Sequence, residues 1–375
     1  MSNRLDKFFP MPDFLRMPAI GLDISDHAVK YVVLKNTNKG LAVEAFGRRD
    51  LEEGIIKHGV IQDEKKLIVI LNEVQKETGL HFARVAIPEM LVYGFNVNIP
   101  KVNHDQIKQA IEFQIEDHVP IQKESLIFDY EILSEGSRSY FIKVNAILKK
   151  TFESYNEALI NSGLSVASFE PEPESVFRAI RLKDGQKNAI VIDLGSRRTS
   201  LSIVGGEKII SSSTVDFSGN LLANIIAGDG SSFEEFEKAK KGMILGDDEK
   251  SEKIKKQIDI LNIEIKKHFN YWKEHLDIED SLPSEDTSVE VFNGKEGSVL
   301  DIEKSGMIPV ILSGGSAHLS GLPEYMSKKL KTNVSFADIW TQKSDSKSGG
   351  KNILKDGLLI YATAIGLALS DFNYD

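Results

Sequence analysis

A short strand-turn-strand pattern occurs twice in this chain, and it limits the fold more than any other feature. The first copy is an apolar, alternating stretch over residues 19–24, followed by a turn at residues 25–27 and a second alternating stretch. The second copy starts with the apolar stretch 189–195. An aspartate stands near the end of each first strand, Asp23 in one copy and Asp193 in the other, 170 residues later. The sequence therefore predicts two matching β-hairpins in an α/β chain, with Asp23 at the tip of the first.

The stretch between the two hairpins contains a different pattern. A helix is predicted over residues 63–78, where Asp63 can cap the N-terminus and Gly79 ends the apolar repeat. From residue 84 to residue 165 the predicted order is β-α-β-β-α, with a helix over residues 104–118. This order is typical of a small α+β subdomain that is inserted into a larger fold.

Composition excludes several classes of protein. The chain has 375 residues, 41% of them hydrophobic, which is enough for two domains. Its net charge of −10 leaves no general excess of Lys and Arg for a phosphate backbone, so we expect no nucleic acid partner. The lack of cysteine removes disulfides and thiolate chemistry. The sequence contains no apolar run of the roughly 18 residues that a membrane span needs and no secretory signal, so we expect a cytoplasmic protein.

The two predicted hairpins have the residues that a pair of phosphate clamps requires. A tight turn exposes backbone N–H groups where no bulky side chain keeps a phosphate away, and each aspartate puts a carboxylate near a metal ion. A third candidate is the apolar strand 310–313, which runs into Gly314 and Gly315. Each signal alone has an ordinary alternative, with Asp23 and Asp193 as turn formers and the glycine pair as the start of a helix.

Together these segments resemble the superfamily of actin, sugar kinases and DnaK-type proteins. The phosphate-1, phosphate-2 and adenosine motifs are matched by Asp23-Ile24-Ser25, Asp193-Leu194-Gly195 and Ser313-Gly314-Gly315. The inserted subdomain resembles that of FtsA and of the type IV pilus assembly family PilM. The residues that carry the resemblance to PilM are Ile87-Pro88, Ile99-Pro100 and His118-Val119-Pro120-Ile121 in the subdomain, and the later stretch 361–369. The resemblance implies an actin-like, ribonuclease H-like fold with two lobes and an inserted small α+β subdomain.

The same resemblance implies an ATP site between the lobes, with Mg²⁺ held by Asp23 and Asp193. Glu172 takes the place of a polar residue near the attacking water, which is the catalytic position. Glu237 and Lys240 resemble a pair that reaches the ribose and base. The other implied contacts to the cofactor come from the two turns and the small residues around them, namely Ser25, Asp26, His27, Lys30, Gly195, Ser196, Arg197, Thr199, Gly219, Gly314, Gly315 and Ser316.

The first turn departs from the superfamily pattern. Ser25 stands where glycine is usual, and Asp26 stands where a hydroxyl residue is usual. Both changes make the turn less roomy and more negative beside the γ-phosphate, where catalysis needs positive stabilisation. We therefore expect ATP to bind and, at most, to be hydrolysed slowly.

The resemblance also suggests a division into domains. An apolar arm precedes the first lobe, and the C-terminal segment returns to that lobe after the second. We expect the arm at 1–18, the first lobe at 19–83, 166–187 and 354–375, the inserted subdomain at 84–165, and the second lobe, with a long helix at 252–276, at 188–353.

Resemblance to PilM implies a cytoplasmic scaffold that is peripheral to the inner membrane through its partners. It would dock the N-terminal peptide of a PilN-like inner-membrane protein near the inserted subdomain and contact other pilus platform proteins, with homo-oligomers left open. Two alternatives remain. An FtsA-like membrane-associated filament protein would end in a basic amphipathic helix, whereas residues 370–375 are short and acidic. A sugar-kinase-type phosphotransferase would need a catalytic carboxylate that the sequence does not reveal.

Overall fold

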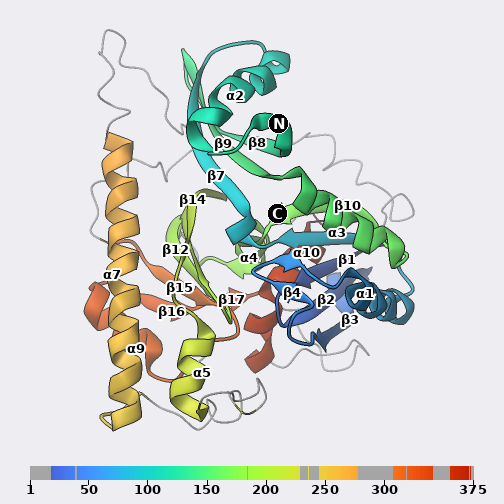
Figure 1. The fold of residues 1–375 in the computed structure, drawn as a ribbon. Coiled ribbons are helices and arrows are strands. Elements are labelled where there is room, and N and C mark those ends of the chain that lie inside the picture. Colours follow the sequence, from blue (N-terminus) through green and yellow to red (C-terminus); the bar gives the residue numbers. More distant parts are fainter. Residues whose placement is uncertain are drawn as a thin grey trace.

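The computed structural model contains two lobes and a smaller unit that extends from the first lobe (Figure 1). In Figure 1 the first lobe lies on the right, the second on the left and the smaller unit at the top. The α/β class expected from the sequence is confirmed. The structure describes residues 18–38, 40–183, 185–228, 235, 245–277, 307–317, 319–340, 355–370 and 372.

The first lobe is built on a five-stranded sheet with the order β10-β6-β1-β2-β3. The first three strands in the sequence form an antiparallel meander, and the two later strands run parallel to β1. The strands are β1 (Ala19–Ile24), β2 (Ala28–Thr37), β3 (Gly40–Asp50), β6 (Phe82–Ile87) and β10 (Ser165–Pro171).

Two pairs of helices cover the two faces of this sheet. On one face, α1 (Glu64–Thr78) and α3 (Lys149–Asn161) enclose a core with the sheet. On the other face, α4 (Glu172–Ala179) and α10 (Ala362–Leu369) pack against the sheet and against each other. Their core is continuous with that of the second lobe, so this helix pair joins the two lobes.

Local capping fixes the ends of α1 as the sequence predicted. The Asp63 side chain accepts a hydrogen bond from the backbone N–H of Lys66 at 3.1 Å. Gly79 ends the helix in the left-handed region, at φ 67°, which glycine adopts without steric penalty. The predicted helix over 104–118 is also confirmed, as α2 (His104–His118).

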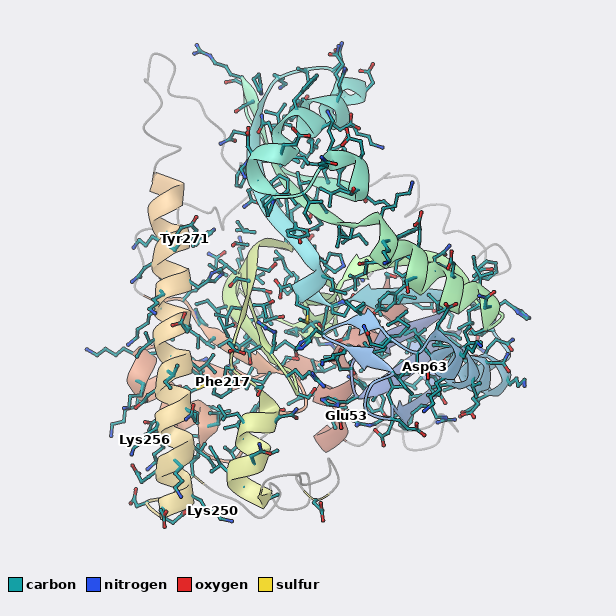
Figure 2. All side chains as sticks on the ribbon, viewed as in Figure 1. Glu53, Asp63, Phe217, Lys250, Lys256 and Tyr271 are labelled. Atoms are coloured by element: carbon teal, nitrogen blue, oxygen red, sulfur yellow. The ribbon has the colours of Figure 1, made fainter. Side chains whose placement is uncertain are left out.

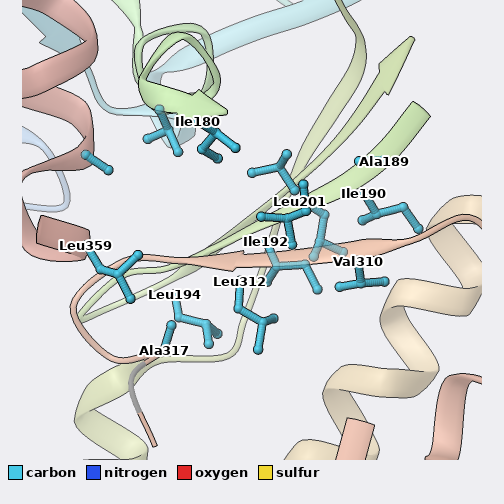
Figure 3. Close-up of a cluster of buried hydrophobic side chains, with 14 of the residues drawn as sticks. Ile180, Ala189, Ile190, Ile192, Leu194, Leu201, Val310, Leu312, Ala317 and Leu359 are labelled. Atoms are coloured by element: carbon cyan, nitrogen blue, oxygen red, sulfur yellow. The ribbon is translucent and has the colours of Figure 1, made fainter. Parts of the chain in front are cut away.

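The second lobe contains a five-stranded sheet with the order β14-β13-β12-β15-β16. Its first three strands in the sequence are again an antiparallel meander, so the predicted repeat of the first hairpin is confirmed. Figure 3 shows the apolar core on this sheet, including Ile190 and Ile192 of β12 and Leu312 of β15. The strands are β12 (Asn188–Leu194), β13 (Thr199–Gly205), β14 (Lys208–Val215), β15 (Val310–Ser313) and β16 (Val334–Phe336).

The second lobe also contains the helices α5 (Gly219–Ala227), α7 (Glu249–Asp277) and α9 (Leu322–Leu330). The predicted long helix is confirmed as α7 and begins three residues earlier than expected. Its apolar stripe, which includes Ile258, is buried in the core of the second lobe. Tyr271 on its outer side is exposed (Figure 2).

The smaller unit has a core of its own. It consists of a three-stranded antiparallel sheet with the order β7-β9-β8, packed on α2. Its strands are β7 (Val92–Pro100), β8 (Leu126–Glu135) and β9 (Ser139–Leu148). Because β6 and α3 belong to the first lobe, the separate sheet and core lie within residues 92–148, a narrower range than the expected 84–165.

The remaining elements are short. They are the two-stranded pairs β4 (Ile56–Lys57) with β5 (Val60–Ile61) and β11 (Ile180–Arg181) with β17 (Asp338–Ile339), and the 3₁₀ helices η2 (Glu89–Leu91), η3 (Lys123–Ser125) and η5 (Lys355–Tyr361).

Helix α10 lies unusually close to β1 and α4, because two glycines leave room for it. A Cβ atom on Gly21 of β1 would lie 2.7 Å from the backbone nitrogen of Ala368. A Cβ atom on Gly366 would overlap the carbonyl group of Ser175 in α4. The backbones of α10, α4 and β1 therefore meet with almost no side chain between them.

Several expectations are corrected or lie outside the described residues. Asp23 lies inside β1 and not at the tip of the hairpin, because β1 extends to Ile24 and the turn is formed by residues 25–27. The arm expected at 1–18 is described only at Pro18, and Glu237 and Lys240 lie outside the described residues. Within the part of the chain that the structure describes, no helix is both long and apolar enough to cross a membrane.

Candidate nucleotide site

The site is built where three segments of the second lobe converge. Gly195, after β12, accepts a hydrogen bond from the backbone N–H of Gly219 at the start of α5, at 2.9 Å. Ser196 accepts one from Asn220 N–H at 2.8 Å, and the N–H of Ser316 donates to Leu194 O at 3.2 Å. Sequence-distant turns are thus fastened to one another by backbone hydrogen bonds.

Glycine is required at this convergence. A Cβ atom on Gly219 would overlap the hydroxyl of Ser316, and one on Gly314 would lie 2.6 Å from Leu194 O. Gly314 also has φ of 88°, in the left-handed region. Gly315 differs, because a Cβ atom there would make an ordinary contact of 3.5 Å with Ile360. The glycines therefore allow the turns to approach one another closely.

The first lobe contributes a buried charge pair to the same region. Asp23 is 3% exposed and accepts a hydrogen bond from the Lys30 ammonium of β2. Lys30 also donates to the carbonyl oxygen of Ile360 in η5, at 3.2 Å. Burial lowers the pKa of Lys30, but the Asp23 carboxylate more than offsets this effect, so that the pKa of Lys30 is raised. Lys30 is therefore charged at neutral pH.

Two further carboxyl groups face this pair. Burial raises the pKa of Asp193 to about 6, with the Asp23 charge adding to the effect and Lys30 opposing it. Burial also raises the pKa of Glu172 well above its usual range, and the charges of Asp193 and Asp23 raise it further. The Glu89 charge raises both values as well. The site thus contains three carboxyl groups and one ammonium group, and a bound cation would favour the ionised form of the carboxyl groups.

These carboxylates fit a magnesium ion that keeps water ligands. Mg²⁺ is usually bound through one or two carboxylates together with substrate phosphates and water. Among the described residues, no group of three or more His, Asp or Glu side chains lies close enough to hold a metal ion by itself. Asp23 and Asp193 therefore suit a metal that arrives with a phosphate ligand better than a closed protein site.

The turns of the two lobes touch each other directly. Arg197 Nε lies 3.0 Å from Asp26 Oδ2 and 3.4 Å from His27 Nε2. Asp26 also accepts hydrogen bonds from the backbone N–H groups of His58 and Gly59, both at 2.8 Å. Burial and the Arg197 charge lower the pKa of His27. Asp26 is thus engaged by three donors, and its negative charge is offset by Arg197.

Two hydroxyl groups that the sequence assigned to the cofactor are already engaged in the turns. Ser25 Oγ donates to Ala28 O at 2.9 Å and closes the β1–β2 turn. Thr199 is fully buried, and its hydroxyl donates to Phe217 O at 2.9 Å, which ties β13 to the segment before α5. Both side chains therefore shape the turns in this structure.

Sequence reasoning missed two contributors to the site. Ile360 provides a backbone carbonyl to Lys30, and no side-chain pattern could reveal that. Glu89 acts on both buried carboxyl groups through its charge. It follows Ile87-Pro88, which indicated only a resemblance in the inserted subdomain.

Comparisons with known proteins agree with this architecture. A family model described as "Type IV pilus assembly protein PilM" matches residues 21–276. The solved structure "PilM-PilN type IV pilus biogenesis complex" is similar over 96% of this chain and 100% of that chain, with 19% identity and a TM-score of 0.69. A sequence comparison with curated proteins gave no match.

Two other solved structures are more distant. Ethanolamine utilization protein EutJ from Carboxydothermus hydrogenoformans has 17% identity and a TM-score of 0.47, over 94% of this chain and 89% of that chain. MreB 5 of Spiroplasma citri bound to AMPPNP has 13% identity and a TM-score of 0.48, over 95% of each chain.

Each lobe contains a strand-turn-strand unit with an aspartate in its first strand, and the two units lie beside each other. This arrangement defines an actin-like protein. Within that class, the family model covers more than half of the chain. The chain belongs to the type IV pilus assembly family PilM.

Proposed function

We propose that this protein is an ATP-binding scaffold of the type IV pilus inner-membrane assembly platform, and that it docks the N-terminal peptide of a PilN-like membrane protein. The observation that carries the nucleotide part is the cluster of Asp23, Asp193 and Glu172 around Lys30, at the junction of the two lobes. Membership of the PilM family supports the pilus process.

In this proposal the phosphates lie between the turns of the two lobes. Asp23 and Asp193 would hold Mg²⁺, which supplies positive charge to the phosphate oxygens when it is bound. Backbone N–H groups of the turns at 25–27 and 195–197, and the Gly314–Gly315 segment, would contact the nucleotide. Glu237 and Lys240 would reach the ribose and base.

Slow hydrolysis, or none, follows from the charges around the turns. Glu172 would orient the attacking water, and burial together with the charges of Asp193 and Asp23 raises its pKa, which favours its protonated form. Arg197 is a cationic side chain at the two turns, but Asp26 pairs with it. A paired guanidinium offers less stabilisation to the charge that develops on a transferred phosphoryl group.

The three-stranded sheet of the inserted subdomain is the proposed surface for the partner. Its strand β7 is an edge strand, and such an edge can take up an extended peptide through main-chain hydrogen bonds. The similar structure of a PilM-PilN complex supports a PilN-like partner. Docking would bring the protein to the inner membrane through that partner, beside other platform proteins.

Calorimetric titration of the full-length chain tests both halves of the proposal. We expect saturable heats with Mg-ATP and, separately, with a synthetic N-terminal peptide of the PilN-like protein from the same genome. A chain that binds neither ligand would contradict the proposal. Binding of Mg-ATP together with a small sugar, without the peptide, would point to a phosphotransferase instead.

A further inference from the structure

Helix α7 exposes a row of large apolar and aromatic side chains to solvent. Ile260, Ile263 and Tyr271 are 54%, 53% and 62% exposed. At about 100° per residue, the three positions fall within roughly 80° of one another around the helix. The opposite side of α7 is buried in the core, and the helix runs along the side of the second lobe that faces away from the first lobe (Figure 1). Single exposed apolar side chains are ordinary on a protein surface, but a row of them is typical of a surface that binds another molecule.

Two charged side chains lie within this row. Glu264 follows Ile260 by four residues, and Lys267 precedes Tyr271 by four residues. The two charges pair along the helix, with 2.8 Å between Lys267 Nζ and Glu264 Oε1, and both side chains remain partly exposed. In either direction along the helix, the row therefore begins with a large apolar or aromatic residue, continues with two opposite charges and ends with another large residue. We call Ile260, Ile263, Glu264, Lys267 and Tyr271 the α7 face.

The α7 face is complementary to itself when two copies run antiparallel. With a two-fold axis between residues 265 and 266, Ile260 of one copy is level with Tyr271 of the other, because both positions are equally far from the axis. Glu264 is level with Lys267 for the same reason, so each charge meets its opposite twice. Ile263 lies beside the axis in both copies. A parallel arrangement would instead put Glu264 beside Glu264 and Lys267 beside Lys267, and like charges repel.

Charge also decides against a lipid surface as the occupant of the α7 face. An amphipathic helix that lies on a membrane is rich in Lys and Arg on its polar face. On α7, Lys267 is paired with Glu264. Lys253, one turn before the face begins, is paired with Glu249 at 2.8 Å. The charges along this side of the helix are thus balanced, which suits a second copy of the same surface better than an anionic membrane.

We propose that the α7 face binds the α7 face of a second copy of this chain, with the two helices antiparallel about a two-fold axis between residues 265 and 266. This contact goes beyond the proposed function and does not depend on it. Among the described residues, none of those assigned to the nucleotide or to the inserted subdomain belongs to α7, so both copies keep these parts accessible. Where the proposed function also holds, two joined copies present two peptide sites to the membrane partner, which strengthens attachment through avidity.

Engineered cysteines test the register of the contact, because the natural chain has no cysteine. Ile260→Cys and Tyr271→Cys proteins, one of them with a size tag, are mixed and mildly oxidised. We expect a disulfide between the two variants and far less between copies of either variant alone. In the antiparallel pair, the two copies of residue 260 lie about 16 Å apart along the helices, at about 1.5 Å per residue, which is beyond the reach of a disulfide. Ile160→Cys is the matched control, because Ile160 is 57% exposed on α3 and should not cross-link to Tyr271→Cys.

Charge reversal tests the pairing of Glu264 with Lys267 between copies. Glu264→Lys and Lys267→Glu should each raise the dissociation constant of the dimer by about tenfold or more, because like charges then face each other twice. An equimolar mixture of the two variants should associate as the wild type does, since every charge again meets its opposite. Mixing restores no pair within either helix, so this recovery reports the contact between copies. Analytical ultracentrifugation measures the constants, and Glu44→Lys, on an exposed residue of β3, should leave the wild-type value unchanged.

Three results would each overturn the inference. They are a wild-type chain that stays monomeric at its highest soluble concentration, a disulfide that forms equally well with the Ile160→Cys control, and charge-reversal variants that dimerise as tightly as the wild type. Melting temperatures equal to that of the wild type show that the variants are folded. Titrations with Mg-ATP and with the PilN-like peptide are independent of this test, so a chain that binds both ligands without dimerising would leave the proposed function standing.

Discussion

Asp26 and Arg197 form an ion pair between the two lobes, with 3.0 Å between Asp26 Oδ2 and Arg197 Nε. Asp26 lies in the turn between β1 and β2, and Arg197 lies in the turn between β12 and β13. The same carboxylate accepts the N–H groups of His58 and Gly59, and the Gly59 carbonyl accepts a hydrogen bond from the Tyr155 hydroxyl of α3 at 2.6 Å. The contact between the lobes is thereby linked to α3, which follows the inserted subdomain.

We predict that Asp26→Asn raises the rate of ATP hydrolysis. In the wild type, Asp26 pairs with the Arg197 guanidinium, and hydrolysis should be far below the roughly 1–100 s⁻¹ of kinases. Asparagine keeps the shape and removes the charge, so Arg197 becomes available to the γ-phosphate. Phosphate-release assays check this, with Asp50→Asn, on an exposed residue paired with Arg48, as the control. A wild-type rate within the kinase range would contradict the argument.

Asp193→Ala should abolish the thermal shift that Mg-ATP gives the wild type. The variant loses one of the two carboxylates expected to hold the metal, whereas its fold should be intact, because burial already disfavours the charge of Asp193. Differential scanning fluorimetry with and without Mg-ATP measures the effect. Asp259→Ala, outside the site and bonded to Tyr325, should keep the full shift. An unchanged shift in Asp193→Ala would remove the assigned site.

Gly366→Val should lower the free energy of unfolding by about 2 kcal/mol or more, since its Cβ atom would overlap the Ser175 carbonyl in α4 and force α10 and α4 apart. Gly94→Ala is the control, because a Cβ atom there comes no closer than 3.4 Å to Asn145. Chemical denaturation of both variants makes the comparison. A Gly366→Val protein as stable as Gly94→Ala would show that the α4–α10 crossing is looser than described.

The stability gain of Glu89→Gln over the wild type should grow as pH rises. Burial raises the pKa of Glu89 in the folded state above its usual 4.5, so the folded protein binds a proton more tightly than the unfolded chain does. Wild-type stability therefore falls as pH increases from about 4.5 through the raised pKa. Glutamine lacks this titration. Melting temperatures between pH 4.5 and 8 test the prediction, and a difference that stays constant with pH would contradict it.

Local sequence signals predicted much of the fold. Asp63 and Gly79 mark the ends of α1, and the spacing of buried positions such as Ile258 predicted α7, because caps and periodicity depend on neighbours along the chain. The repeat of Asp23 at Asp193 indicated that the chain has two related halves. These features could be predicted from the sequence because each one depends on local patterns of a few consecutive residues.

The contacts between distant segments could not be predicted from the sequence. The pairing of Asp26 with Arg197 joins turns 171 residues apart. Because Arg197 offsets the charge of Asp26, this aspartate does not simply add negative charge to the phosphate site, as the sequence suggested. Glu89 showed no signal, because its importance comes from burial against β14. Strand length also decided that Asp23 lies inside β1 and not at the tip of the turn.

The inserted subdomain can be removed cleanly because its chain enters and leaves on neighbouring strands. Val92 at the start of β7 pairs with Ile147 near the end of β9, so a short Gly-Ser linker can replace residues 92–148. Its core is separate from those of the two lobes. Lys143 would be lost and Glu174 would be left without its partner, so the replacement should also carry Glu174→Gln.

Calorimetric titration of this replacement protein with the PilN-like peptide tests the scaffold most directly. The Mg-ATP thermal shift serves as the folding control and should remain, because the nucleotide residues lie in the two lobes. We predict that peptide binding, present in the full-length chain, is lost. Peptide affinity similar to that of the full-length chain would contradict the account, because the partner site would then lie outside the inserted subdomain.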